Sequence, residues 1–215
     1  MLKVEHMEAY GFEAAIRGMR NPLNSWGKSD SHYACDADGD PESQKYIIGE
    51  NDMGLMRRLF KGGTEHRKFM RQIYVSMDIT APLYWWKEFD TYKVGTTANS
   101  CSTMHKIQAK EFTLEDFSTE HLTAPSLSRF MLIINIMNSY REEFNETKSK
   151  DAWWQMIQLL PTSYNQKRTV TMNYEVAYSI IKQRTGHKLD EWHTFIDELK
   201  KLPYLTDIME EYADE

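Results

Sequence analysis

The chain has 215 residues, of which 41% are hydrophobic and 13% aromatic, which is enough to bury one core and excludes a disordered chain. Its formal net charge of −6 supplies no excess of cations for a nucleic-acid backbone, although a local cationic patch can still hold a small phosphorylated ligand. No signal segment opens the sequence and no run of 18 apolar residues occurs, so we expect a soluble, cytoplasmic protein without a membrane partner.

Hydrophobic spacing in the first half of the chain predicts three helices and one strand around a polar excursion. The clearest strand lies over 69–79, where the side chains alternate strictly. We expect Thr80 to cap the helix that follows and Pro82 to lie in its first turn. In chain order the expected elements are a helix over 8–19, a turn-rich excursion within 20–50, a helix over 51–61 ended by Gly62 and Gly63, the strand over 69–79, and the helix after Pro82.

The second half is predicted to be largely helical. One of these helices begins at Leu189. Its residues Trp192, Phe195 and Leu199 share one face, which indicates core packing. The order of elements predicts one α+β domain over 1–215, with a small mixed or antiparallel sheet flanked by helices. The expected elements are helices over 125–144, 150–160, 173–184, 189–201 and 204–213, and a short strand over 168–172.

Two patterns invite a metal ion, and neither is complete. The segment DADGD at 36–40 resembles a calcium loop, but Pro41 and Ile47 stand where such a loop needs glycine and glutamate. Cys101 and His105 have the spacing of a ligand pair on a helix, yet no second pair completes four ligands. The chain has two cysteines, Cys35 and Cys101, and neither belongs to a C-x-x-C pair, which argues against a disulfide framework. We therefore predict no metal site.

The most informative stretch is 92–105, which reads YKVGTTANSCSTMH and follows an aromatic segment over 83–89. It is dense in serine and threonine, and it contains Gly95 to relax the backbone and Lys93 to supply charge. Because buried hydroxyls need hydrogen-bonding partners, the stretch is unsuited to a core. It indicates a surface that holds an anionic, hydrogen-bonding small molecule, with phosphate the usual candidate. The alternative is a loop or edge strand satisfied by its own backbone.

This stretch resembles the motif of the flavin-dependent thymidylate synthases, in which R-H-R precedes S-x-N-E-x-S-x-R-Y. Residues 97–105 follow the second half of that motif at the same spacing. Asn99 and Ser102 match in identity, and Thr97 places a hydroxyl where the family has serine.

The resemblance extends over about residues 60–205. Upstream of the motif, Glu65-His66 resembles a Glu-His pair of the family. Downstream, residues 159–161 resemble a V-L-P sequence that ends a helix, and Asn173 and Arg184 match a T-x-N-x-R…R pattern. Since the order and spacing of these motifs agree, the resemblance predicts the family's fold.

Several arginines of the family's motifs are missing. The R-H-R triplet is Tyr92-Lys93-Val94, and three further arginine positions hold Met104, Ile157 and Glu175. In the family these cations hold the phosphates of the flavin and the nucleotide, and lysine cannot reproduce the two-pronged hydrogen bonding of arginine. The candidates to replace them are Lys87, Lys93, Lys106, Arg71 and Lys182.

The resemblance implies an enzyme that transfers a one-carbon unit from methylene-tetrahydrofolate to carbon 5 of a pyrimidine deoxynucleotide, deoxyuridylate (dUMP). In such an enzyme FAD supplies the hydride and NADPH reduces the flavin again. The resemblance also implies a homotetramer with ligand sites at subunit interfaces. The alternative, which the missing arginines favour, is a non-catalytic or regulatory descendant that binds a nucleotide or flavin.

The resemblance assigns a role to each matching residue. The catalytic residues are Ser102, near the reacting end of the nucleotide, and Arg184, which would polarise and hold the pyrimidine ring. Ser100 joins these two residues in substrate binding. The cofactor-binding residues are His66, Lys93, Asn99 and Asn173.

Structural interpretations stand beside these functional ones. Arg184 could simply complement the C-terminus of its helix in solvent, and His66 could lie in a solvated turn. Cys101 is best interpreted as a small residue that fills a tight loop, since the family's reaction needs no thiolate. The tryptophan pairs at 85–86 and 153–154 favour core or subunit contacts over ring stacking on a ligand.

Overall fold

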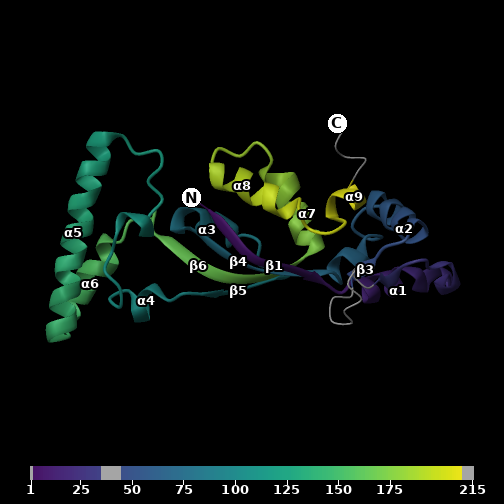
Figure 1. The fold of residues 1–215 in the computed structure, drawn as a ribbon, viewed down its shortest axis with the longest axis horizontal. Helices are drawn as coiled ribbons and strands as arrows, with labels where there is room; N and C mark the ends of the chain where they lie inside the picture. Colours follow the sequence, from purple (N-terminus) through teal and green to yellow (C-terminus); the bar gives the residue numbers. More distant parts are fainter. Residues whose placement is uncertain (1, 35–44, 210–215) are drawn as a thin grey trace.

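The computed structural model describes residues 2–34 and 45–209, and a four-stranded antiparallel sheet runs through its centre (Figure 1). The strand order is β1-β4-β6-β5, which leaves β5 at an edge. These strands are β1 (Lys3–Tyr10), β4 (Tyr74–Pro82), β6 (Asn165–Asn173) and β5 (Thr96–Ser100). A separate two-stranded sheet joins β2 (His32–Ala34) and β3 (Lys45–Ile47). The α+β prediction is confirmed.

Three helices cover one face of the sheet (Figure 1). They are α3 (Leu83–Phe89), α7 (Tyr174–Arg184) and α8 (Asp190–Leu199). Along β4, Val75 and Met77 are buried, while Ser76 between them is only partly buried, as a period-2 strand requires. Trp85, Trp86 and Trp192 are almost fully buried, and rings of this size contribute much of the buried apolar area. The predicted core positions in α8 are confirmed.

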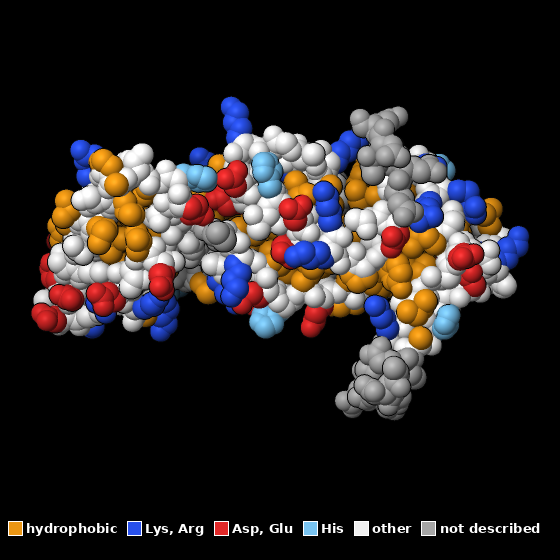
Figure 2. Space-filling model, turned by 45° about the horizontal axis from the view of Figure 1, so that its top comes forward, with side chains coloured by type: hydrophobic (Ala, Val, Ile, Leu, Met, Phe, Trp, Pro, Cys, Tyr) orange, Lys and Arg blue, Asp and Glu red, His pale blue; other side chains and the backbone are white. Residues whose placement is uncertain are grey.

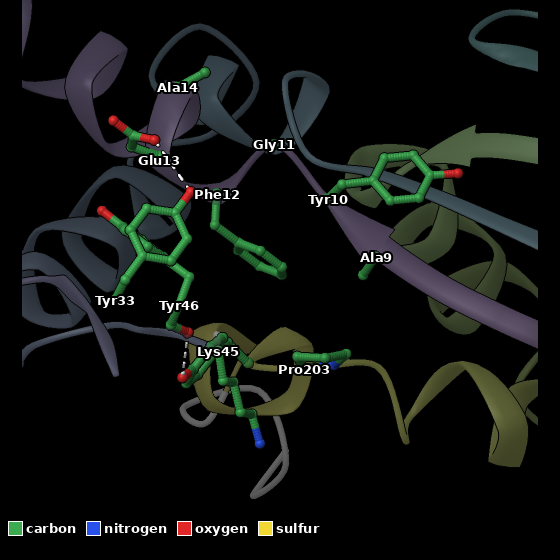
Figure 3. Close-up of a pocket in the computed structure, with 11 residues that line it drawn as sticks. Ala9, Tyr10, Gly11, Phe12, Glu13, Ala14, Tyr33, Lys45, Tyr46 and Pro203 are labelled. Atoms are coloured by element: carbon green, nitrogen blue, oxygen red, sulfur yellow. Dashed lines mark hydrogen bonds between the residues drawn. The ribbon is translucent and has the colours of Figure 1, made fainter. Parts of the chain in front are cut away.

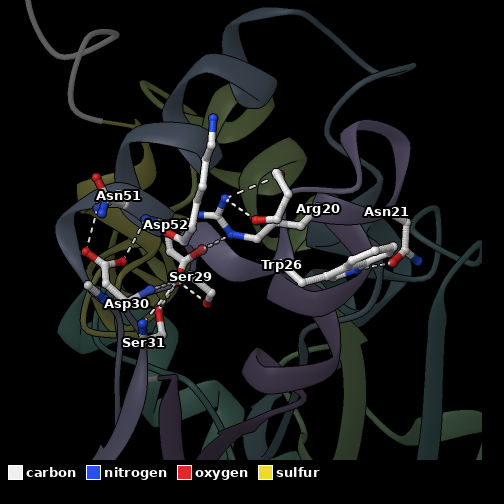
Figure 4. Close-up of polar contacts among 11 residues, drawn as sticks. Arg20, Asn21, Trp26, Ser29, Asp30, Ser31, Asn51 and Asp52 are labelled. Atoms are coloured by element: carbon white, nitrogen blue, oxygen red, sulfur yellow. Dashed lines mark hydrogen bonds and ion pairs between the residues drawn. The ribbon is translucent and has the colours of Figure 1, made fainter.

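Three helices pack near the end of β1, and a buried ion pair joins the first two of them. Those helices are α1 (Phe12–Arg20), α2 (Glu50–Lys61) and α9 (Leu205–Met209). Arg20 Nε donates to Asp52 Oδ1 at 2.6 Å, and both side chains are buried (Figure 4). The hydroxyls of Ser29 and Ser31 each donate to Asp52 at 2.7 Å. Such additional hydrogen bonds offset the desolvation of a buried ion pair. Through them, Asp52 of α2 holds the loop that contains Ser29 and Ser31 against the helix.

The opposite end of the molecule is an arm of two packed helices, α5 (Ala124–Thr147) and α6 (Lys150–Leu159) (Figure 1). A second hydrophobic cluster joins them, with Met137 and Met156 fully buried. The outer side of α5 is apolar too, since Met131, Leu132 and Ile136 are between 48% and 61% exposed. Figure 2 shows apolar side chains gathered at this end of the surface.

The predicted boundaries were wrong at two places in the first half. The strand over 69–79 begins only at Tyr74, because Lys68–Arg71 form a 3-10 turn in which the adjacent Phe69 and Met70 are both buried. A period-2 strand cannot bury two consecutive side chains on one face. The helix expected over 8–19 begins at Phe12, because the residues before Gly11 pair with β4 as part of β1.

Thr80 is not a helix cap. It lies inside β4, opposite Lys3 of β1 and Lys167 of β6, and Pro82 occupies the N-cap position of α3. The polar excursion also contains the two short strands of the β2–β3 hairpin, which the sequence pattern did not predict.

Five of the predicted helices and the short C-terminal strand are confirmed within a few residues, namely those over 51–61, 125–144, 150–160, 173–184, 189–201 and 168–172, and the helix expected after Pro82 is α3. The last predicted helix is α9 over its described part. The segment DADGD and Cys35 lie outside the described residues. None of the described helices is both long enough and apolar enough to span a membrane.

Candidate functional site

The hydroxyl-rich stretch begins with a tight turn that packs against the start of α7. Gly95 has a φ of +77°, and a Cβ added there would lie 2.8 Å from Asn173 Nδ2 and 3.3 Å from Val176 Cγ2. Asn173 caps α7, because its Oδ1 accepts a hydrogen bond from the Val176 amide at 3.0 Å. Glycine is therefore required at this turn by both its backbone angle and the closeness of Asn173.

Two clefts adjoin this turn, and Tyr92 and Lys93 line both of them. The smaller cleft, of about 260 Å³, is completed by Phe89, Asp90, Thr96 and Ala98. The larger, of about 500 Å³, is completed by Thr91, Val94, Glu175, Val176, Ser179 and Gln183. Lys93 is exposed, and it has no ion-pair partner among residues 2–34 and 45–209. Its ammonium group is thus available to an anion in either cleft.

Arg184 supports this turn from behind and lines neither cleft. Its Nε donates to the Tyr92 hydroxyl at 2.9 Å, and its Nη1 pairs with Glu88 at 3.0 Å. The guanidinium also lies over the Trp192 ring, 4.6 Å from its centroid, and the side chain is 18% exposed. Arg184 is therefore partly buried and held by these partners, whereas a simple helix-end charge would lie in solvent.

Arg168 is a cation near the site that the sequence analysis missed. It lies on β6 opposite Ser100 of β5, and its Nη1 pairs with Asp90 at 2.7 Å. The guanidinium lies 4.2 Å from the centroid of Trp86. The sequence did contain a hint of this role. Arg168 lies two residues before the buried Val170 and therefore shares its face of the strand, where a charged side chain needs a partner.

Glu175 occupies a position where the family has arginine, and two arginines from the turn after α2 pair with it. Arg67 Nε and Arg71 Nε each donate to one of its carboxylate oxygens at 2.9 Å. Arg71 is one of the expected replacement cations, whereas Arg67 was not foreseen. His66 lies beside Arg67 in the same turn, and its ring would touch a Cβ added at Gly62 at 3.0 Å.

The predicted substrate-binding serines lie toward the other end of β5. Asn99 is exposed opposite Thr169, and Ser100 follows it. Ser102 caps the short helix α4 (Thr103–Lys106), because its hydroxyl accepts backbone hydrogen bonds from the two residues that follow Thr103, at 3.2 and 3.1 Å. Four strand steps of about 3.4 Å separate the two ends of β5. Within the described chain, no contact joins Ser102 to Arg184.

The predicted residues thus fall into two groups. Lys93, Asn173 and Arg184 gather around the turn and α7, with His66 on the neighbouring turn. The members of the second group, along and after β5, are Asn99, Ser100 and Ser102. In the part of the chain that the structure describes, no group of three histidine, cysteine or acidic side chains is placed to hold a metal ion.

A separate cavity of about 450 Å³ lies where β1 meets α1 (Figure 3). Five of the eleven residues that line it are aromatic, among them Phe12, Tyr33 and Tyr46. Tyr33 donates a hydrogen bond to Glu13 at 3.1 Å, which raises the pKa of the tyrosine. None of the predicted site residues lines this cavity, and β1 is the sheet edge opposite β5.

Solved structures with the same fold are found over nearly the whole chain. The flavin-dependent thymidylate synthase ThyX of Helicobacter pylori, complexed with FAD and dUMP, matches with a TM-score of 0.66 and 16% identity, over 95% of this chain and 96% of that chain. A second structure of that enzyme with FAD and dUMP gives 0.68 and 15%, over 100% of both chains. A UMP/dUMP methylase, PolB of Streptomyces cacaoi, bound with 5-Br dUMP, gives 0.60 and 12%, over 96% and 93%.

No family model matches the sequence, and no curated protein sequence matches it. The structural likeness nevertheless defines the fold, which is that of the flavin-dependent thymidylate synthases. The resemblance drawn from residues 60–205 is therefore confirmed at the level of the fold.

The larger cleft is lined by polar residues, both donors and acceptors of hydrogen bonds, whose chemistry fits a phosphorylated, hydroxyl-bearing ligand such as part of a flavin nucleotide. Lys93 offers an ammonium group, Ser179 a hydroxyl, Gln183 an amide and Glu175 a carboxylate. A cleft of this volume suits a small-molecule ligand. No arginine is among the described residues that line either cleft, and the cationic side chain that lines both of them is Lys93.

Proposed function

We propose that this protein is a divergent flavin-dependent thymidylate synthase. It would transfer a one-carbon unit from methylene-tetrahydrofolate to carbon 5 of a pyrimidine deoxynucleotide, dUMP. Bound FAD would supply the hydride, with NADPH as its reductant. The observation that carries the proposal is the turn at Tyr92 and Lys93, which lines two adjoining clefts in a chain with this fold.

The cofactor-binding residues in this proposal are Lys93, Asn173, His66 and Asn99. Lys93 holds a phosphate by charge, because it is exposed at both clefts without an acidic partner in the described chain. Asn173 fixes the first turn of α7 and thereby the wall of the larger cleft, while its Nδ2 lies close to Gly95. In this proposal His66 contacts the cofactor from the turn after α2, and Asn99 contacts it from the exposed edge strand β5.

The nucleotide-binding residues in this proposal are Ser100, Ser102 and Arg184. The serines offer hydroxyl groups at the far end of β5, and Arg184 offers a fixed cation that can stabilise charge on a pyrimidine ring oxygen. Because Ser102 and Arg184 do not meet within one chain, the complete site is proposed to lie between subunits. The outer side of α5 has the apolar surface to bury between copies, and we propose a cytoplasmic homotetramer.

Flavin binding and turnover test the proposal directly. The purified protein should be yellow or should bind added FAD, and the loaded protein should then bind dUMP. With NADPH and methylene-tetrahydrofolate it should release thymidylate. A protein that binds neither FAD nor dUMP would refute the proposal.

A non-catalytic or regulatory nucleotide- or flavin-binding role is the second candidate. It is favoured by the arginines near the clefts, which are already engaged by carboxylates: Arg184 by Glu88 and Arg168 by Asp90. A ligand phosphate would have to compete with these partners. Binding of FAD and dUMP without any thymidylate formation would select this role.

A further inference from the structure

Aromatic rings from three separate segments line the cavity of about 450 Å³ where β1 meets α1 (Figure 3). Phe12 begins α1, Tyr33 and Tyr46 belong to the β2–β3 hairpin, and Tyr204 directly precedes α9. The cavity shares no lining residue with the two clefts beside Lys93. It is therefore a separate site, to which the proposed function assigns no role.

Neighbouring rings in this cavity stand close to perpendicular. The Tyr33 and Tyr46 rings meet at 67°, with centroids 4.9 Å apart, and the rings of Phe12 and Tyr204 meet at 81°, with centroids 5.7 Å apart. A flat ligand stacks best between rings that are parallel to each other. Rings at right angles instead form the corners of a box, in which a compact group meets aromatic rings from several directions. We call these four rings the aromatic box.

Hydrogen bonds and packing outside the aromatic box hold its walls in place. The Tyr204 hydroxyl accepts from the Ile48 amide at 3.4 Å and donates to the Tyr46 carbonyl at 3.2 Å. The backbone of Tyr204 has a φ of +61°, which bulky residues adopt only where their surroundings enforce it. Asp30, just before the hairpin, accepts from two amides at the start of α2 at 2.9 and 3.1 Å. The cavity is thus preformed, as ligand sites usually are.

Among the residues that line the cavity, the charge placed beside a ring is negative. Glu13 Oε2 accepts from the Tyr33 hydroxyl at 3.1 Å, so a carboxylate lies at the outer end of that ring (Figure 3). Arg17 lies 3.7 Å from the other carboxylate oxygen, and it does not line the cavity. Lys45 lines the cavity, but Figure 3 shows its side chain extending away from the rings. This arrangement favours a cationic ligand over an anionic one.

We propose that the aromatic box binds a compact organic cation, such as a quaternary ammonium ion or a methylated amine. Several aromatic rings together recognise such ions, because the π-systems attract the positive charge. A cavity of about 450 Å³ suits a small-molecule ligand of this kind. The inference goes beyond the proposed function, since it uses none of the residues assigned to the flavin or the nucleotide.

A competing interpretation makes the cavity only an apolar hollow. Choline and its neutral isostere 3,3-dimethylbutan-1-ol separate the two interpretations, because the alcohol replaces the charged nitrogen by carbon. An aromatic box should bind choline more tightly than the alcohol by about twofold to thirtyfold, the range of one cation–π contact. An apolar hollow should prefer the alcohol, which costs less to desolvate than an ion.

The test titrates choline chloride, tetramethylammonium chloride and the alcohol into the full-length protein by calorimetry, at constant ionic strength. Tyr33→Leu removes a ring but keeps an apolar side chain. It should weaken choline binding by about twofold to thirtyfold and leave the binding of the alcohol unchanged. Tyr33→Phe keeps the ring and should retain most of the choline affinity.

Glu13→Gln should weaken choline by about twofold to fivefold, the range expected for an exposed charge. Glu198→Gln is its matched control, because both substitutions remove a helix carboxylate from a pair with a nearby cation. This control should leave the choline affinity unchanged. If melting curves show that Tyr33→Leu is unfolded, Glu13→Gln decides the question, since Glu13 is exposed.

Three outcomes would overturn the inference: no binding of either cation by the wild type, binding of the alcohol as tight as that of choline, or equal choline affinity in the wild type, Tyr33→Leu and Glu13→Gln. If the protein binds FAD but neither cation, the inference fails and the proposed function stands. If it binds choline through Tyr33 but neither FAD nor dUMP, the proposed function fails and the inference stands.

Discussion

The guanidinium of Arg184 donates from Nε to the hydroxyl of Tyr92 at 2.9 Å. In the sequence resemblance, Arg184 matches the last arginine of the family's C-terminal pattern, and Tyr92 stands where the R-H-R triplet begins. The Tyr92 hydroxyl in turn donates to Gln183 at 3.1 Å. Because Tyr92 lines both clefts, a change at Arg184 is transmitted to the proposed ligand site.

Arg184→Lys should weaken dUMP binding by about tenfold or more. A single ammonium cannot bond Tyr92 and Glu88 in the geometry of the guanidinium, and it loses the planar stacking on Trp192. Titration of deoxyuridylate, deoxycytidylate and thymidylate against wild type and variant measures the effect and its ring selectivity. Lys200→Gln, an exposed substitution at the end of α8, should leave all three titrations unchanged.

If Arg184 served the fold alone, Arg184→Lys would lower the melting temperature and leave nucleotide affinity at the wild-type value. That outcome would remove Arg184 from the proposed site.

Lys93→Ala should weaken FAD retention and leave the order of preference among pyrimidine rings unchanged. The ammonium is exposed at both clefts, so its contribution is a Coulombic attraction to phosphate. Raising the ionic strength from about 0.01 M to about 1 M shortens the Debye length from about 30 to about 3 Å. The salt dependence of FAD affinity should therefore be steeper for the wild type than for the variant, and equal slopes would contradict a phosphate contact by Lys93.

Gly95→Ala should destabilise the protein more than Gly63→Ala does. Both glycines have positive φ, +77° and +87°, so each substitution incurs a backbone cost of about 1–2 kcal/mol. Only at Gly95 would the new methyl also press on Asn173, at 2.8 Å, whereas nothing lies within 4 Å at Gly63. Urea unfolding of both variants measures the difference, and equal losses would show that the contact with Asn173 relaxes freely.

Asp52 should make the folding stability depend on acid pH. Burial alone would raise its pKa, but hydrogen bonds from Ser29, Ser31 and Arg20 outweigh burial and hold the pKa below its usual value. A carboxyl group with a lowered folded-state pKa stabilises the fold above its unfolded pKa, about 3.9, and this stabilisation is lost as the pH falls through the folded-state pKa.

The variant Asp52→Asn removes this dependence. It leaves Arg20 buried without its counter-charge, so we expect a loss of about 3–5 kcal/mol near neutral pH and a flatter acid limb in urea unfolding. Glu198→Gln, which removes a surface pair with Lys201, should cost at most about 1 kcal/mol. Parallel pH curves for wild type and Asp52→Asn would contradict this role.

Leu132→Asp should dissociate the proposed homotetramer. Leu132 is 61% exposed on the apolar outer side of α5, where a charge would be desolvated on assembly. Light scattering after size exclusion measures the mass. Lys200→Asp, an exposed change at the end of α8 and outside α5, is the control and should leave the mass unchanged. A strictly monomeric wild type would rule out the composite site.

Local sequence patterns were enough to predict those helices and strands in which the spacing of hydrophobic residues matches the pattern of buried side chains. The alternation that buries Val75 and Met77, and the helical spacing that buries Trp192 and Phe195, determine which side of each element is apolar. β1 could not be predicted in this way, because its alternation is weak and its strand conformation comes from pairing with β4. The family resemblance, drawn from residue order and spacing, was enough to predict the fold.

The partners of the charged residues were decided by the tertiary structure alone. Glu175 is paired with Arg67 and Arg71, which are 108 and 104 residues away in the chain, and Arg168 with Asp90. No local pattern identifies such partners, because the folding of the whole chain brings them together. The sequence could therefore show which motif arginines are missing, whereas only the packing of α2, α3 and α7 determined which cations stand near the clefts and which carboxylates hold them.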